Sequence, residues 1–471
     1  MSAALSPKPR ALPWPRLTLI GCLLLLGGCA YAIVSGGRVN EAKVAKIEGG
    51  IQDLRELRFK SPVPIVVKSQ DDAEAIIEAE MMRDYSGEQL QAEGAAGVMM
   101  GLLPAGTDLK SSELSLLKSQ VAGFYDPRGK QMVLVEGITN VGFLNSTAEF
   151  FMQRDVAGEM LLAHELTHAL QDQNLNLQSS LDRVKDDDDR SIALKAVAEG
   201  DATLAGFAYA MGGMSNANAD LLAEQLKDLP TVLAEQSPGT PDGLTVPLAF
   251  QYSEGVKFVG EAYHRGGWAA VDALYRNPPQ SSHQILHPSL YFTGTPAVPP
   301  EIHFPDYEKI MPGWKTVDQD TIGELLIRVI LENNLGKQSK DAALAAVWTA
   351  DRAVILKRDR EFAVIWMVSF RNASWAGQFA AAYARVLDRV NGAATQHRVG
   401  TRGDTVMVTI GKSTEHFDSL WPANGESSAP GHMSSPVCYR PVGPTAIPDE
   451  KKSRPVKRPL ITAIGATSLL L

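Results

Sequence analysis

Apolar residues recur every three to four positions along much of the chain, the spacing that places them on one face of an α-helix. This pattern predicts helices over residues 41–59, 73–82, 191–211, 319–335 and 374–392. Shorter apolar runs predict strands over 65–67, 353–356, 362–370 and 406–410. A Gly- and Ala-rich stretch, 94–103, predicts a tight connection or a small helix. The chain therefore mixes both element types.

Two strand-like runs, 121–125 and 131–135, flank the turn signal Asp126-Pro127-Arg128-Gly129 and predict a β-hairpin. An edge strand there would offer unpaired backbone groups to an extended peptide. An ordinary structural hairpin is the alternative, and the sequence leaves both open.

The clearest chemistry lies in a predicted helix over 159–174, which contains His164-Glu165-Leu166-Thr167-His168. Two imidazoles four residues apart project from one side of a helix, so one zinc ion could bind both at about 2.0–2.1 Å. Glu165 would lie beside the ion, where it could take a proton from a water molecule on the metal. An uncoordinated His pair is the alternative, but burying it on this apolar stretch would be costly. The motif predicts zinc-dependent hydrolysis.

A catalytic zinc needs a third protein ligand and an open position for water. A metzincin would supply a Gly and then a third His after the motif, but Gln171 and Asn174 stand there, so that class is excluded. Glu199 is the best remaining candidate, because small residues around it (Ala196, Ala198, Gly200 and Ala202) would let its helix approach the zinc helix. Asp201 is the alternative ligand. We prefer Asp201 as a residue that orients an imidazole through its other ring nitrogen, with Thr203 as the second candidate for that role.

Charge and composition argue against two kinds of binding partner, nucleic acid and calcium. The formal net charge of −9 and the absence of a Lys/Arg-dense stripe in the body of the sequence argue against nucleic acid. The acidic run 186–189 predicts a solvated loop rather than a calcium loop, because it lacks alternating ligand spacing and a Gly.

The beginning of the sequence predicts export. Lys8, Arg10 and Arg16 precede an apolar run, 17–26, and small residues then lead to Cys29. This resembles a bacterial lipoprotein signal peptide over 1–29, with lipid attached to Cys29. An ordinary secretory signal or an uncleaved membrane anchor would be the alternatives, and each places the rest of the chain outside the cytoplasm. We expect a protein of the cell envelope, anchored to a membrane by lipid on its periplasmic or cell-surface side.

We expect no intramolecular disulfide bond, because Cys22 lies within the predicted signal peptide and Cys438 is then left without a partner.

Three segments together resemble a known family. They are the zinc motif extended through 164–173, Ala198-Glu199-Gly200-Asp201-Ala202 and Val121-Ala122-Gly123-Phe124-Tyr125-Asp126-Pro127. Over residues 40–300 the chain is similar to a family of uncharacterised bacterial neutral zinc metallopeptidases of the gluzincin, thermolysin-like type. The resemblance implies that His164, His168 and Glu199 bind the zinc. Thr203 departs from the Asp that thermolysin-like enzymes carry four residues after the ligand Glu.

A second block, 278–288, resembles the family's Pro-Pro-x-Ser-Thr-Glu-Gln-Ile-Leu-His-Pro segment, with Ser282 and His283 in place of Thr and Glu. The resemblance implies that His287 could return to the site and stabilise an oxyanion, with Tyr291 as another donor. The alternative is that His287 only caps or bridges a loop.

The sequence thus predicts an α+β, zincin-like fold, with a small sheet whose hairpin edge strand packs on the zinc helix and with a mostly helical C-terminal half. The zincin-like domain would span 40–300, an α/β extension or small domain 301–420, and a tail 421–471. The predicted function is a peptidase with one catalytic Zn²⁺ and Glu165 as general base, acting on peptide or protein substrates. Two alternatives stay open: a membrane-tethered binding protein with a structural zinc, and a zinc hydrolase acting on another bond.

Overall fold

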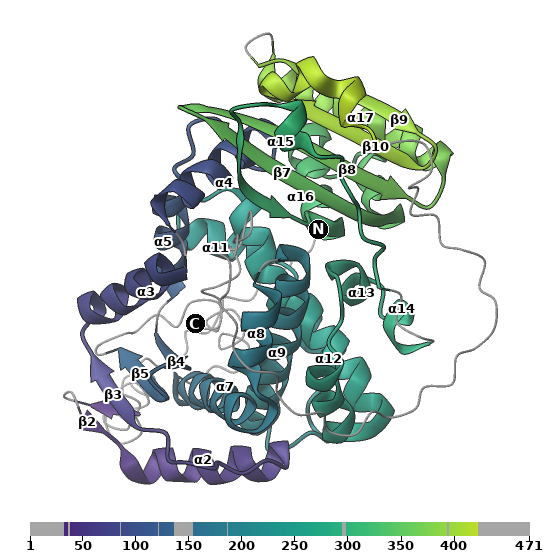
Figure 1. Ribbon diagram of the computed structural model, residues 1–471. Helices are drawn as coiled ribbons and strands as arrows, with labels where there is room; N and C mark the ends of the chain where they lie inside the picture. The colour runs from purple at the N-terminus through teal and green to yellow at the C-terminus, as the bar shows by residue number, and fades with distance from the viewer. Residues whose placement is uncertain are drawn as a thin grey trace, which may run out of the picture.

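The two larger β-sheets of the described residues lie apart in the computed structural model, with helices between them (Figure 1). The structure describes residues 33–35, 38–84, 86–120, 122–135, 154–185, 187–293, 298–392 and 395–422. The predicted signal, Cys29 and the predicted tail from residue 423 onward lie outside these ranges.

The smaller sheet holds the predicted hairpin. Its three strands lie in the order β3 (Ile65–Lys68), β5 (Gln131–Val135) and β4 (Gly123–Asp126), with β3 parallel and β4 antiparallel to β5. The first strand of the hairpin ends at Asp126, one residue beyond its predicted end, and β4 is an edge strand that packs on the helix carrying His164 and His168. A strand pair of two residues each, β1 (Val34–Ser35) and β2 (Arg38–Val39), precedes this sheet.

The described N-terminal residues form four helices: α2 (Glu41–Arg55), α3 (Gln70–Asp84), α4 (Gly87–Met100) and α5 (Leu109–Gln120). The stretch 94–103 is not a tight connection, since most of it belongs to the longer helix α4. That helix begins with a capping box, in which the Ser86 side chain and Gln89 satisfy each other's backbone N–H groups.

The centre of the molecule is helical. Its elements are α7 (Arg154–Leu175), α8 (Leu177–Val184), α9 (Asp188–Ala210), α10 (Ala219–Gln225), α11 (Leu229–Gln236), α12 (Asp242–Arg276), α13 (Ser282–Leu286), α14 (Ser289–Phe292) and α15 (Tyr307–Ile310). Helix α9 is buried along nearly its whole length, between α7 and α12. The prediction of a solvated acidic loop is wrong: Asp187 caps α9, and Asp188 and Asp189 are buried in its first turn. Carboxylates are favourable at a helix N-terminus, which explains why the run begins a helix.

The larger sheet is antiparallel and lies at one end of the molecule (Figure 1). Its strands lie in the order β6 (Lys315–Asp320), β7 (Trp348–Arg358), β8 (Glu361–Phe370), β10 (Thr405–Ile410) and β9 (His397–Arg402). Helices α16 (Gly323–Leu335) and α17 (Ala373–Asn391) accompany it, with 3₁₀ segments over Ala342–Val347 and Gly411–Leu420. The C-terminal half is therefore only partly helical. The edge strands β6 and β9 escape the sequence prediction because they carry few apolar residues, which is usual at a sheet edge.

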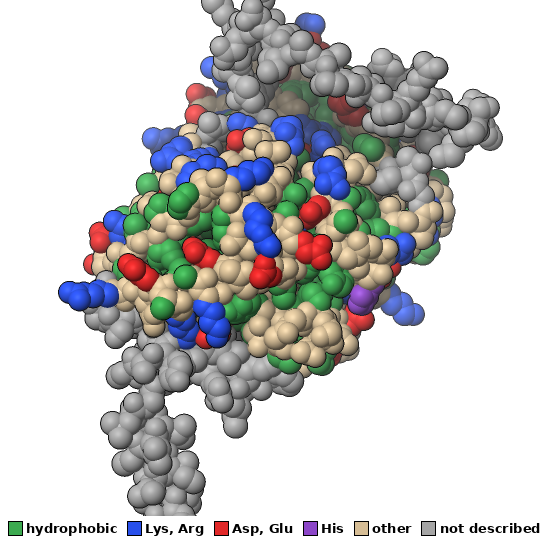
Figure 2. Space-filling view, turned by 90° about the horizontal axis from the view of Figure 1, so that it is seen from below, with side chains coloured by type: hydrophobic (Ala, Val, Ile, Leu, Met, Phe, Trp, Pro, Cys, Tyr) green, Lys and Arg blue, Asp and Glu red, His purple; other side chains and the backbone are tan. Residues whose placement is uncertain are grey.

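One hydrophobic core runs through most of the described chain, from Val44 in α2 to Ile410 in β10. A second, smaller cluster lies on the other face of the large sheet, around Trp314, Ile365 and Trp421. The fold is α+β, and the boundaries predicted at 40–300 and 301–420 stay predictions. Among the described helices, none combines the length and the apolar character that crossing a membrane requires. On the face shown in Figure 2, basic and acidic side chains are interspersed with apolar ones.

Candidate metal centre

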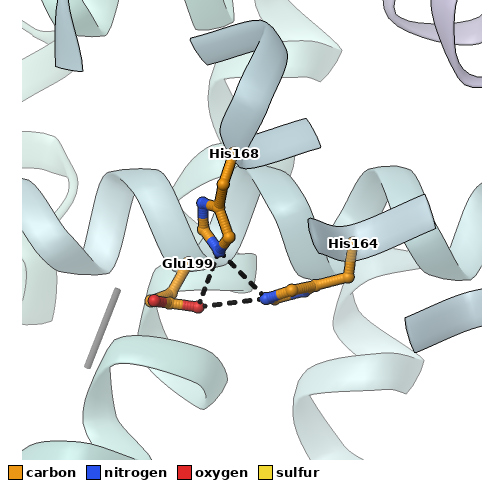
Figure 3. A group of neighbouring side chains, drawn as sticks. All are labelled: His164, His168 and Glu199. Carbon is orange, nitrogen blue, oxygen red and sulfur yellow. Dashed lines mark hydrogen bonds and ion pairs between the residues drawn. The ribbon is translucent and has the colours of Figure 1, made fainter. Parts of the chain in front are cut away.

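Three side chains from two helices converge at one point (Figure 3). His164 and His168 extend from α7, and Glu199 extends from α9. The two Nε2 atoms are 3.1 Å apart, and Glu199 Oε2 lies 3.2 Å from His164 Nε2 and 3.5 Å from His168 Nε2. All three side chains are buried.

These distances fit a metal ion. Ligand atoms at the corners of a tetrahedron, each about 2.0–2.1 Å from its centre, are about 3.3 Å apart. The three separations lie around that value, and the donor set of two imidazole nitrogens and one carboxylate oxygen is one that zinc and similar ions accept. The residues present therefore could hold a metal ion.

Close helix packing brings Glu199 to the two imidazoles. A Cβ at Gly206 of α9 would lie 2.8 Å from the Met160 carbonyl oxygen of α7, so only glycine allows this approach beside His164. Gly200, which we expected to face the zinc helix, faces α12 instead, where its Cβ would lie 2.3 Å from the Gly255 carbonyl carbon. Helix α9 is thus held between two neighbours at backbone contact.

Glu165 lies beside the three ligands without joining them. Its Oε2 accepts a hydrogen bond from the Tyr125 N–H of β4 at 2.9 Å, and its Oε1 lies 4.0 Å from His164 Nε2. Burial raises the pKa of Glu165, although the neighbouring imidazoles oppose the rise. A carboxylate with one anchored oxygen and one oxygen facing the cluster is arranged to exchange a proton there.

Without a metal ion, His168 and Glu199 carry opposite charges. Burial alone would lower the pKa of His168, but the charge of Glu199 outweighs it and raises the pKa to about 9. Burial alone would raise the pKa of Glu199, but His168 and the hydrogen bonds from both imidazoles lower it to about 2. The buried cluster therefore keeps a proton on His168 opposite the carboxylate of Glu199, and a metal ion that binds there would displace that proton.

A residue that the sequence analysis did not select orients His168. Its Nδ1 donates to the Gln171 side-chain oxygen at 2.9 Å, and the Gln171 amide donates to Asp201 Oδ2 at 3.1 Å. Asp201 also accepts from Arg55 Nε at 2.8 Å and from the Tyr275 hydroxyl at 2.8 Å. Asp201 therefore acts through Gln171 and not directly on an imidazole. The i,i+3 spacing of His168 and Gln171 on one helix face was the signal that could have revealed this.

Thr203 does not share this role: its buried hydroxyl has no hydrogen-bond partner among the described residues.

Tyr252 of α12 is the other site residue that the sequence analysis missed. Its ring stacks against His164 with centroids 6.2 Å apart, and its hydroxyl interacts with Glu199. Burial and the charges of Glu199 and Glu165 raise the pKa of Tyr252, which keeps it a hydrogen-bond donor. The sequence showed Tyr252 only as an aromatic residue in a helical segment, where a core role is the usual outcome.

His287 and Tyr291 do not reach this centre. His287 Nε2 lies 3.0 Å from Glu324 Oε2, in a separate group that also contains His283. The Tyr291 hydroxyl donates to the Asn277 carbonyl oxygen. The expected oxyanion role of these two residues is therefore not met by the geometry. His287 does lie at the end of a helical turn, as its alternative interpretation had it.

A family model described as a domain of unknown function, DUF8575, matches residues 309–420, which hold all five strands of the large sheet. No curated protein matches the chain. Among solved structures, the chain is similar to that of "a putative hydrolase with a novel fold from Chloroflexus aurantiacus". The likeness has a TM-score of 0.37 and 16% identity, and covers 60% of this chain and 98% of that one. A likeness this distant does not bear on the activity of this chain.

Proposed function

We propose that this protein is a zinc-dependent peptidase. The observation that carries the proposal is the arrangement of Glu165: its carboxylate lies beside three converging ligand side chains and is not one of them. A purely structural metal site has no use for such a group and would usually fill the fourth position with another ligand.

Each residue then has a chemical role. His164, His168 and Glu199 would hold the ion, which when bound polarises the scissile carbonyl and lowers the pKa of water to about 7. Glu165 accepts a proton from the attacking water and passes it to the leaving amine. Burial raises the pKa of Glu165, which favours its holding the proton until the leaving amine takes it. The Tyr252 hydroxyl, beside Glu199, is placed to donate a hydrogen bond to developing negative charge.

Strand β4 supports a peptide as substrate. It is an edge strand, and its Tyr125 N–H already points outward to Glu165 rather than to β5. An extended peptide that follows this strand would bring its backbone to the general base. The same ion and general base could also hydrolyse an ester, so the experiment must distinguish peptide from ester cleavage.

The test compares purified wild-type protein with Glu165→Gln on a mixed peptide library, with and without a chelator. We expect chelator-sensitive cleavage by the wild type and a loss of about 10²–10⁴-fold in the variant, because general-base catalysis contributes that much. Zinc content should be equal in both, since Glu165 is not a ligand.

Glu159→Gln is the matched control. Glu159 lies on the same helix and pairs with Lys43 at 3.2 Å, away from the cluster, so this variant should keep both zinc and cleavage. Metal-loaded wild type that cleaves neither peptides nor model esters would favour the non-catalytic binding protein. Cleavage of esters alone would favour the other hydrolase.

We also propose that the chain is exported and anchored to a membrane by lipid on Cys29. The proposal rests on the basic residues, apolar run and small residues that precede this cysteine. Expression with a radiolabelled fatty acid should label the membrane-bound wild type but not Cys29→Ser. Equal labelling of both proteins would contradict it.

A further inference from the structure

We propose a second metal site, formed by His283, His287 and Glu324, distinct from the candidate catalytic centre. His283 lies in α13, His287 ends that helix, and Glu324 lies in the first turn of α16. Ligand atoms of all three lie within 4.8 Å of one another. The site would take a borderline divalent cation such as Zn²⁺.

The geometry resembles that of the first centre. Glu324 Oε2 is approached both by His283 Nδ1 and by His287 Nε2, the latter at 3.0 Å, and Glu324 Oε1 lies 3.1 Å from His287 Nε2. The imidazoles again lie four residues apart on a helical turn, and again meet a carboxylate from another helix. The two distances from His287 Nε2 to the Glu324 oxygens are close to the value of about 3.3 Å expected between ligands of a tetrahedral ion, and His283 Nδ1 also reaches this carboxylate.

The neighbouring structure holds the carboxylate in place. Asp351 fixes the start of α16 by accepting from the Ile322 and Gly323 N–H groups at 2.8 and 2.9 Å, and its carboxylate also accepts from the indoles of Trp348 and Trp366. The Leu325 N–H donates to the Ser282 hydroxyl at 3.2 Å, which ties α16 to the start of α13. The two helices that supply the ligands are therefore joined before any ion binds.

A further constraint lies at Gly323. Its φ of +70° favours glycine, and a Cβ there would lie 2.0 Å from Asp189 Oδ1. The same Asp189 oxygen accepts from the Ser282 N–H at 3.1 Å. The residue before each of His283 and Glu324 thus contacts one buried carboxylate, which sets the distance between the two ligands.

Exposure distinguishes this site from the first. The side chains of His283 and His287 are 17% and 37% exposed, whereas Glu324 is 4% exposed. A buried carboxylate under two accessible imidazoles lets an ion enter from solvent and leaves a position for water or a further ligand. Bound there, the ion would cross-link α13 to α16 and so join the helical centre to the segment 309–420.

The experiment measures zinc bound per chain after the purified protein is stripped with chelator, loaded with zinc alone and dialysed. We expect two ions per wild-type chain and one in His283→Gln. His287→Gln, changed at the more exposed ligand, should give the same loss and serves as the second variant if the first fails to fold. His397→Gln is the matched control, because His397 pairs at 3.1 Å with the exposed Asp388, belongs to neither cluster, and should keep both ions.

A companion variant separates this proposal from the proposed function. His168→Gln should lose the ion of the candidate catalytic centre and keep the ion of the second site. If His168→Gln keeps both ions while His283→Gln loses one, the second site is supported and the metal site of the proposed function is not. Zinc should raise the thermal unfolding temperature of His168→Gln, and the rise should vanish when His283→Gln is added. If wild type and His283→Gln bind the same number of ions, the second site is overturned. His283, His287 and Glu324 would then be only a hydrogen-bonded group.

Discussion

At the scale of single residues, the candidate centre depends on side chains beyond its three candidate ligands. Gln171 accepts from His168 Nδ1, which fixes the tautomer that leaves Nε2 free to bind. Its amide in turn is held by Asp201 and by the Ala198 carbonyl oxygen. This chain of contacts makes Gln171 a positioning residue.

Replacing Gln171 with Leu should lower zinc affinity by about 10–100-fold, because the imidazole of His168 loses its orienting partner. Titration with a competing chelator measures this change, and cleavage at saturating zinc should fall less than affinity. Gln173→Leu is the control, since Gln173 accepts from the Lys60 and Ser61 N–H groups and contacts no ligand. Equal zinc affinity in Gln171→Leu and wild type would contradict the role.

At the scale of elements, the ligands are set by how closely three helices pack. Helix α9 contacts α12 at Gly200 and Gly255 and contacts α7 at Gly206. These backbone contacts fix the position of Glu199 relative to the two imidazoles. Arg55 adds a buried polar link: from α2 it donates to Asp201 of α9 and to Asp272 of α12.

Gly255→Ala should destabilise the protein by about 1–3 kcal/mol, because its Cβ would lie 2.2 Å from the Ala196 carbonyl oxygen and would push α9 from α12. The same shift should weaken zinc binding through Glu199. Denaturant unfolding and zinc titration measure the two effects. Gly377→Ala, in an exposed part of α17 with open space at its Cβ, should instead stabilise by about 0.5–1 kcal/mol.

Arg55→Met should cost about 3–5 kcal/mol of unfolding free energy, because it leaves Asp201 buried without its cation. Arg58→Ala, which breaks an exposed pair with Asp53, should cost only about 0.2–1 kcal/mol. If the two variants lose similar unfolding free energies, the buried contacts of Arg55 with Asp201 and Asp272 do not hold the three helices together.

At the scale of the whole molecule, buried carboxyl groups on α4 and α5 make the stability of the fold depend on pH. Burial, followed by the charge of Asp318 of β6, raises the pKa of Glu93 of α4. Burial likewise raises the pKa of Glu113 of α5 from 4.5 to about 8, although Lys195 opposes the rise. These groups favour folding in their protonated form.

The sign of the resulting pH dependence follows from the raised pKa. The folded chain binds the Glu113 proton more tightly than the unfolded chain, so its stabilising contribution is fully present below about pH 4.5 and is lost as the pH rises through about 8. Relative to Glu113→Gln, the wild type should lose at most about 1.4 kcal/mol per pH unit in this range and then level off. Denaturant unfolding at several pH values measures this. A constant difference would contradict it, and Glu78→Gln controls for removing an exposed carboxylate.

The sequence by itself determined the elements with strong local signals. The periodic apolar face of α7, the hairpin turn after Asp126 and the buried strands β7, β8 and β10 could be recognised because their side chains meet many apolar neighbours. The edge strands β6 and β9 and the first turn of α9, from Asp188, could not be recognised in the same way. Their polar residues are satisfied by partners distant in the sequence, such as Asp320, which accepts from the Asp188 N–H.

For the candidate centre, the sequence determined which residue types are present and the spacing of His164, Glu165 and His168 on one helix. Only the tertiary structure decided which carboxylate faces them, that Gln171 stands between Asp201 and His168, and that His287 belongs with Glu324. The physical reason is that helical spacing fixes neighbours within a few residues. Contacts between helices depend instead on the packing of small residues such as Gly200 and Gly206, whose direction no local pattern reveals.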